Sequence, residues 1–135
     1  MPESKPIGET LQEVTSNWER GDFSTWHECL DPDLVVTGFD PDGTHRARGP
    51  SEASDYLRRF FRQFRDYRIE VEGFDRITPE AVLMHGRQIG TGRISGLEVK
   101  ESLYVVFRLA GDRVIEMHWH PERSGALRAA GLEPG

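Results

Sequence analysis

The feature that most constrains the fold is a change of hydrophobic period after Asp66. Before this residue, apolar side chains recur every three or four positions, which is the spacing of one helical face. After it they alternate with polar ones, so that Tyr67, Ile69 and Val71 are separated by charged residues. Such alternation is typical of half-buried antiparallel strands. Helical segments followed by a run of strands indicate an α+β fold.

Three helices are expected on the N-terminal side of this change. The first covers about residues 7–20 and is followed by a glycine, and a short second helix covers 23–30. A β-branched strand is expected at 33–39, and a turn-rich loop with two prolines and two glycines follows it. The third helix has Ser51 as its expected N-cap and carries a wide apolar stripe, with arginines on its other side.

Four strands are expected after the third helix, at 67–74, 81–93, 97–109 and 113–120. A short C-terminal helix follows the last strand and is closed by Gly131. The sheet must bury its apolar face, and the three N-terminal helices are the only cover for it. The expected architecture is therefore a cone, with a curved antiparallel or mixed sheet wrapped around three helices and an open mouth. Ligand sites tend to occupy such concavities.

Length and charge exclude several classes of protein. The 135 residues predict a single domain over 1–135, with an ordered core of about 7–132. The formal net charge of −6 argues against nucleic acid or an anionic membrane as a partner. Cys29 is the sole cysteine, so neither an internal disulfide nor a cysteine-based zinc cluster can form. With no apolar leader visible and only short apolar runs, we expect a cytoplasmic protein.

Four segments together resemble the SnoaL-like branch of the nuclear transport factor 2-like superfamily. They are "WERGDFSTWHECLDPDLVV", "RARGPSEASDYLRRFF", "GRQIGTGRISGLEV" and "ERSGALRAAGL". Their order and spacing carry the resemblance, which covers the chain from about Leu11 to Leu132. It implies an α+β cone with an internal pocket and frequent homodimers through the open sheet face. Members include polyketide cyclases, ketosteroid isomerase and noncatalytic binding modules, so the fold alone leaves the function open.

The resemblance to ketosteroid isomerase can be followed residue by residue. The motif "FDPDG" places Asp40 where that family has its general base. The two oxyanion-hole donors of the family would fall at Val14 and at about Val105, and valine donates no hydrogen bond from its side chain. Since an oxyanion hole supplies much of the catalysis of enolisation, steroid isomerisation is not expected. Where polyketide cyclases have an acid/base Asp on a late strand, this chain offers His118 and His120.

The pair His118 and His120 flanks Trp119 on the last expected strand. A histidine side chain titrates near neutral pH and can move a proton, so both are candidate catalytic partners of Asp40. Alternation puts the two histidines on one face together with Val114, and Met117 and Trp119 on the other, more apolar face, which is the better candidate for the core. The pattern therefore leaves open whether the histidines line the pocket or face a partner subunit.

The remaining candidate residues would bind ligand. His85 and Arg87 share a strand face and could orient an anionic or carbonyl group, or lie on a dimer face with Tyr104. The expected aromatic wall of the pocket consists of Trp18, Trp26, Phe60 and Trp119, which suits a flat hydrophobic ligand. No metal is expected, because no spacing supplies a third ligand beside the histidines.

Two function hypotheses follow. The first is a small-molecule-binding protein that performs cofactor-independent acid/base chemistry on a hydrophobic cyclic or polyketide-like substrate, as an isomerase, cyclase, dehydratase or hydrolase. The alternative is a noncatalytic module of the same fold that binds a ligand or a protein. An enzyme requires an ionisable side chain within hydrogen-bond reach of another inside the pocket. A homodimer through the sheet face is expected in either case.

Overall fold

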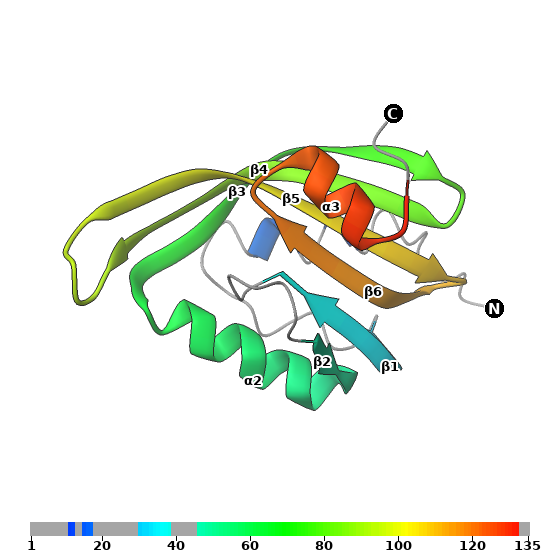
Figure 1. Ribbon diagram of the computed structural model, residues 1–135, viewed down its shortest axis with the longest axis horizontal. Coiled ribbons are helices and arrows are strands. Elements are labelled where there is room, and N and C mark those ends of the chain that lie inside the picture. Colours follow the sequence, from blue (N-terminus) through cyan, green and yellow to red (C-terminus); the bar gives the residue numbers. More distant parts are fainter. Residues whose placement is uncertain (1–10, 13–14, 18–29, 39–45, 133–135) are drawn as a thin grey trace.

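The computed structural model describes residues 11–12, 15–17, 30–38 and 46–132 (Figure 1). These residues form one six-stranded sheet in the order β2-β1-β6-β5-β4-β3. The strands are β1 (Leu30–Thr37), β2 (Arg46–Arg48), β3 (Phe64–Thr78), β4 (Ala81–Gly92), β5 (Glu98–Ala110) and β6 (Arg113–His120), and the helices are α2 (Gly49–Phe61) and α3 (Arg123–Ala129). Residues 11–12 and 15–17 are helical as well.

The sheet is mixed, as the sequence pattern allowed. The four strands β3 to β6 pair antiparallel in chain order, which confirms the alternation predicted after Asp66. β1 joins the free edge of β6 in parallel, and β2 extends the sheet antiparallel to β1. The long strands β3, β4 and β5 bend away from the rest of the molecule as an arm (Figure 1). The architecture is the α+β cone expected from the sequence.

Two hydrophobic clusters cover opposite faces of this sheet. The main core lies on the face toward α2, which we call the inner face, and includes Leu34, Val36, Leu57, Ile69, Met84, Val105, Met117 and Trp119. A smaller second core lies on the outer face, where Ala126, Leu127 and Ala130 of the α3 region pack on Leu83 and Val106. Met117 and Trp119 therefore belong to the core, as the alternation in the last strand predicted.

Several boundaries differ from the sequence predictions. Ser51 is not the N-cap of its helix: α2 already starts at Gly49, with Arg48 as N-cap and proline in the first turn, because proline fits the first turn, where its missing N–H costs nothing. The strand β2 lies where a loop was expected, and β1 begins at Leu30 rather than residue 33. The expected helix at 23–30 lies mostly outside the described residues.

A β-bulge changes the alternation on β6. Pairing with β5 shifts register between Arg108 and Leu109, so that Glu116 lies opposite Arg108 while Val114 lies opposite Leu109. Val114 therefore joins the main core instead of sharing a face with His118. A bulge inserts an extra residue and reverses the facing of everything beyond it. Among the described residues, no helix has the length and apolar character needed to cross a bilayer.

Candidate functional site

His118 lies on the outer face of the sheet, opposite the main core. Its neighbour across the β5–β6 ladder is Val106 of the second core, and its neighbour on β1 is Thr37. Only 2% of its surface is exposed. Its Nδ1 lies 2.8 Å from Oγ1 of Thr37, and its Nε2 lies 2.7 Å from Oε1 of Glu116. Both ring nitrogens are therefore engaged within the protein.

The two hydrogen bonds define the state of the His118 ring. Burial lowers the pKa of His118 below its usual 6.5, and the charges of Arg46 and Arg108 act in the same direction against the opposing effect of Glu116. The ring is therefore neutral at pH 7. A carboxylate only accepts, so Nε2–H donates to Glu116, and Nδ1 then accepts from the hydroxyl of Thr37.

The chain of contacts continues from His118 to α3. Nε of Arg108 lies 3.8 Å from the second oxygen of Glu116, and its Nη1 donates to the carbonyl of Ala130 at 2.7 Å. Ala130 is the C-cap of α3, so its carbonyl has no partner inside the helix. This polar network joins β1, β6, β5 and α3. We interpret it as a structural connection between these elements.

His120 also lies on the outer face. Its Nδ1 accepts a hydrogen bond of 3.0 Å from the backbone N–H of Glu122, in the turn before α3. The ring lies directly against Gly125, where a Cβ atom would collide with it. The missing side chain of Gly125 thus lets the first turn of α3 approach β6. His120 is directed away from the inner face, and its catalytic role stays a prediction.

His85, Arg87 and Tyr104 occupy the outer face too. His85 lies opposite Tyr104 on β5, and Tyr104 packs against the second core. Nε2 of His85 is 4.0 Å from the carboxylate of Asp75. Nη2 of Arg87 is 3.5 Å from that of Glu70. All three predicted ligand-binding residues are therefore on the face opposite the main core. Since α3 covers part of this face, the predicted homodimer would have to use the remainder of β3 to β5.

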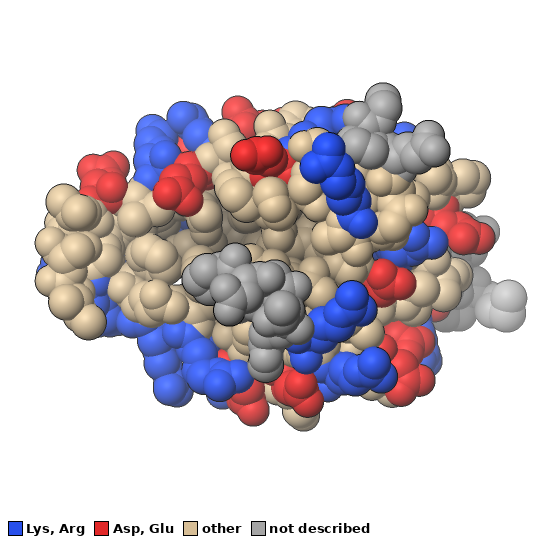
Figure 2. All heavy atoms as spheres, viewed as in Figure 1, with Lys and Arg blue, Asp and Glu red and all other residues tan. Residues whose placement is uncertain are grey.

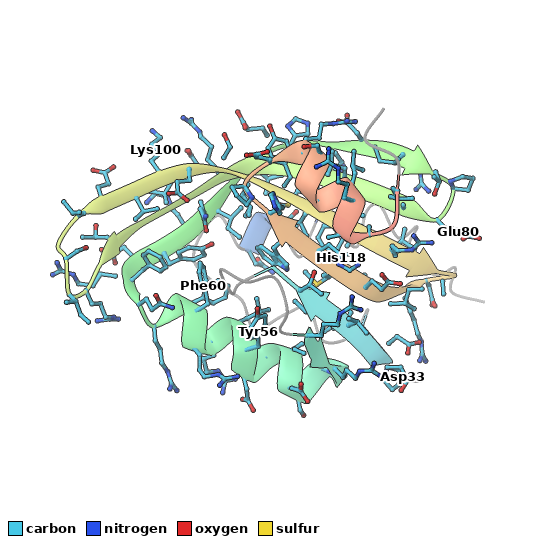
Figure 3. The ribbon with its side chains drawn as sticks, viewed as in Figure 1. Asp33, Tyr56, Phe60, Glu80, Lys100 and His118 are labelled. Carbon is cyan, nitrogen blue, oxygen red and sulfur yellow. The ribbon has the colours of Figure 1, made fainter. Side chains whose placement is uncertain are left out.

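The inner face carries a continuous group of aromatic rings at the C-terminal end of α2. This aromatic group consists of Phe60, Phe61, Phe64 and Tyr67. Phe61 and Tyr67 are stacked with their centroids 4.7 Å apart, and Phe60 meets the edge of Tyr67 at 5.8 Å. The three phenylalanines remain half-buried. Figure 3 shows Phe60 and Tyr56 rising from α2 into the space between the helix and the sheet.

A polar relay starts at Tyr67 and crosses the inner face of the arm. Oη of Tyr67 donates to Oε1 of Gln88 at 2.8 Å, and Nε2 of Gln88 donates to Oε2 of Glu101 at 3.4 Å. Gln88 lies opposite Ile69 of the main core on one side and Glu101 on the other, so the relay is on the inner face. Burial, together with the negative charge of Glu101, raises the pKa of Tyr67.

A ligand site at Tyr67, Gln88 and Glu101 was not predicted from the sequence. A signal for it was nevertheless present. Gln88 is in phase with Met84 on β4, and Glu101 is in phase with Leu103 on β5, so both are polar residues at core-facing positions. Polar side chains in the core phase of a strand are candidates for a function when they lie beside aromatic residues.

Several predicted residues have other placements. Asp40, Trp18 and Trp26 lie outside the described residues. Trp119 is fully enclosed in the main core, with 2% of its surface exposed. No group of three or more metal-ligating side chains occurs within the parts of the chain that the structure describes.

The surface differs between the two sides of α2. Figure 2 shows a hollow at the centre of the visible face, with mostly uncharged walls and charged residues around its rim. A separate groove of about 440 Å³ runs along the exposed side of α2 and is lined by Glu52, Asp55, Arg58, Arg59 and Arg62. This groove is charged throughout, so it does not match the apolar pocket that the sequence predicted.

The sheet topology and the two-sided packing define an α+β cone of the nuclear transport factor 2-like class. The SnoaL-like domain family matches residues 11–117, and the chain belongs to this family. No curated protein matches the chain.

Solved structures share the fold at low sequence identity. A nuclear transport factor 2-like protein of unknown function from Burkholderia pseudomallei is 20% identical, with a TM-score of 0.73 over 91% of this chain and 95% of that one. A protein from Jannaschia, named as a candidate SnoaL-like polyketide cyclase, is 19% identical, with a TM-score of 0.71 over 88% of this chain and 90% of that one. A hypothetical protein from Catenulispora acidiphila, solved with trimethylamine, is 13% identical, with a TM-score of 0.71 over 93% and 95%.

Proposed function

We propose that the protein binds a small, flat hydrophobic molecule against the inner face of its sheet, beside the aromatic group. The observation that carries this proposal is the combination of half-buried phenylalanine rings with the relay from Tyr67 to Glu101. Rings offer a large apolar contact, and a few directed polar groups fix the orientation of a ligand.

The same proposal bears on catalysis. His118 has both nitrogens bonded within the protein and is directed to the outer face, so this proposal assigns the proton transfer to another residue. A cofactor-independent acid/base reaction on a cyclic or polyketide-like substrate would take its base from Asp40, as the resemblance implies, or from Glu101. Without such a reaction the protein is a binding module. The binding step is common to both hypotheses and is therefore the first to test.

Protein-observed NMR with a small set of flat apolar compounds provides the test. We expect the shifted signals to map to the aromatic group and to Gln88. The substitution Phe60→Leu keeps the apolar volume but removes the ring, and should weaken binding by about tenfold, the size of an aromatic contact. Tyr104→Phe on the outer face is the matched control and should leave affinity unchanged. Shifts confined to the outer face, or equal affinity for Phe60→Leu and wild type, would contradict the proposal.

A further inference from the structure

The orientation of the Gln88 amide determines the direction of the whole relay. Glu101 is exposed, and an ionised carboxylate can only accept hydrogen bonds. The amide nitrogen of Gln88 must therefore face Glu101, because its oxygen in that place would be repelled. The amide oxygen then faces Tyr67, so the hydroxyl of Tyr67 must donate to it. The direction of donation runs from the buried tyrosine to the exposed carboxylate.

This direction fixes which groups remain for a ligand. The single proton of Tyr67 is used by Gln88, so the hydroxyl cannot also donate to a ligand carbonyl or enolate. What remains for a ligand at the exposed end of the relay is the negatively charged carboxylate of Glu101, which accepts hydrogen bonds and attracts cations. Burial raises the pKa of Tyr67, which keeps the phenol protonated and the direction intact.

The aromatic rings at the other end of the relay also present negative electrostatic potential to a ligand. The faces of Phe60, Phe61 and Phe64 carry partial negative charge from their π-systems and attract cations. Lys100, the residue beside Glu101 on β5, points to the other side of the sheet, away from Phe60 (Figure 3). The register between β4 and β5 is unbroken, so Lys100 and Glu98 both occupy the face opposite Glu101. Glu101 thus has no cation beside it from its own strand on the inner face.

We propose that the inner-face site selects a hydrophobic molecule that carries an organic ammonium group, with Glu101 facing the positive charge and the aromatic group packing on the hydrocarbon part. The inference rests on the proposed function, since it names the ligand class of the same site. A carboxylate at the exposed end of the relay, beside the negatively polarised faces of aromatic rings, fits a cation. It does not fit a carboxylate or a developing oxyanion.

The test uses three probes with the same ring and different charge: benzyltrimethylammonium, benzyl alcohol and benzoate. Affinities are measured by NMR titration at low salt. We expect the ammonium probe to bind about tenfold more tightly than benzoate, from one charge pair together with a cation–π contact. Glu101→Gln should weaken binding of the ammonium probe by about fivefold and leave the affinity for benzyl alcohol unchanged. Glu98→Gln removes the same charge from the other face of the same strand and should change the affinity for neither of these two probes.

The outcomes separate the two proposals. Binding of benzyl alcohol at the inner face without a preference for the ammonium probe overturns the inference and leaves the proposed function standing. An equal loss in Glu98→Gln and Glu101→Gln overturns it as well, because the effect would then come from net charge. If none of the three probes shifts inner-face signals, the proposed function fails, and the inference falls with it.

Discussion

Replacement of His118 by glutamine tests the polar network that joins β1 to β6. Glutamine carries its amide nitrogen and oxygen on one terminal carbon, so it can keep only one of the two hydrogen bonds of the ring, either to Thr37 or to Glu116. The other partner then loses its bond, and Thr37 is itself buried. Loss of one bond at a buried group costs about 1–3 kcal/mol. We expect that decrease in the free energy of unfolding, measured by urea denaturation at about pH 8.

The same substitution gives a pH dependence with a defined sign. Burial lowers the pKa of His118 in the folded protein below the ordinary value of 6.5. As the pH falls through 6.5, the unfolded chain takes up a proton that the folded chain does not. The histidine's contribution to stability is therefore complete above about pH 6.5 and declines below it, by at most about 1.4 kcal/mol per pH unit.

The assay is the difference in unfolding free energy between wild type and His118→Gln, taken at a series of pH values from about 8 to about 5. All other titrating groups are present in both proteins and cancel in this difference. We expect the advantage of the wild type to shrink as the pH falls. A difference that grows toward acid would show that folding raises the pKa of His118, and a constant difference would show that folding leaves this pKa unchanged. Either result would refute the lowered pKa on which the neutral ring and its assigned hydrogen-bond directions rest.

Three further substitutions test the packing on the two faces, each by thermal or urea denaturation. Gly38→Ala should destabilise by about 3 kcal/mol or more, because φ is +118° there and the new Cβ would meet the backbone carbonyl of Trp119; a loss under about 1 kcal/mol would contradict this. Gly125→Ala meets only the His120 ring, which can turn aside, so about 1 kcal/mol is expected, and a loss equal to that of Gly38→Ala would argue against it. Leu127→Ala opens a cavity in the second core and should cost about 2–4 kcal/mol; a near-neutral result would mean that α3 is not held against the sheet.

Much of the sheet could be predicted from local pattern. Strands of period two show which residues share a face, so Met117 and Trp119 were correctly assigned to the core. The features that were predicted wrongly depend on pairing between strands, which a local stretch of sequence does not show. β2 has three residues, too few for any period, and it exists because Arg46 to Arg48 pair with β1. The bulge at Ile115 of β6 likewise appears only in the pairing with β5, so alternation alone put Val114 on the wrong face.

The residues of the candidate site also divide into those that local pattern predicted and those that only strand pairing brings together. Phe60 was predicted as a pocket wall, and the structure places it in the aromatic group on the inner face. The relay was missed because its members come from three strands, and only the pairing of β3, β4 and β5 brings Tyr67, Gln88 and Glu101 into one line. Individually, each is an ordinary polar residue in a strand.

By itself, the sequence determined the class of fold, the order of its elements and the faces of most strands, because helical and strand periods are local properties of the chain. The tertiary structure decided what the histidines of the last strand contact. His118 could have served a pocket or a partner subunit, and alternation could not distinguish between them. The parallel addition of β1 placed Thr37 beside one ring nitrogen, and Glu116 holds the other. Those contacts join residues far apart in sequence, which is why only the folded chain could show them.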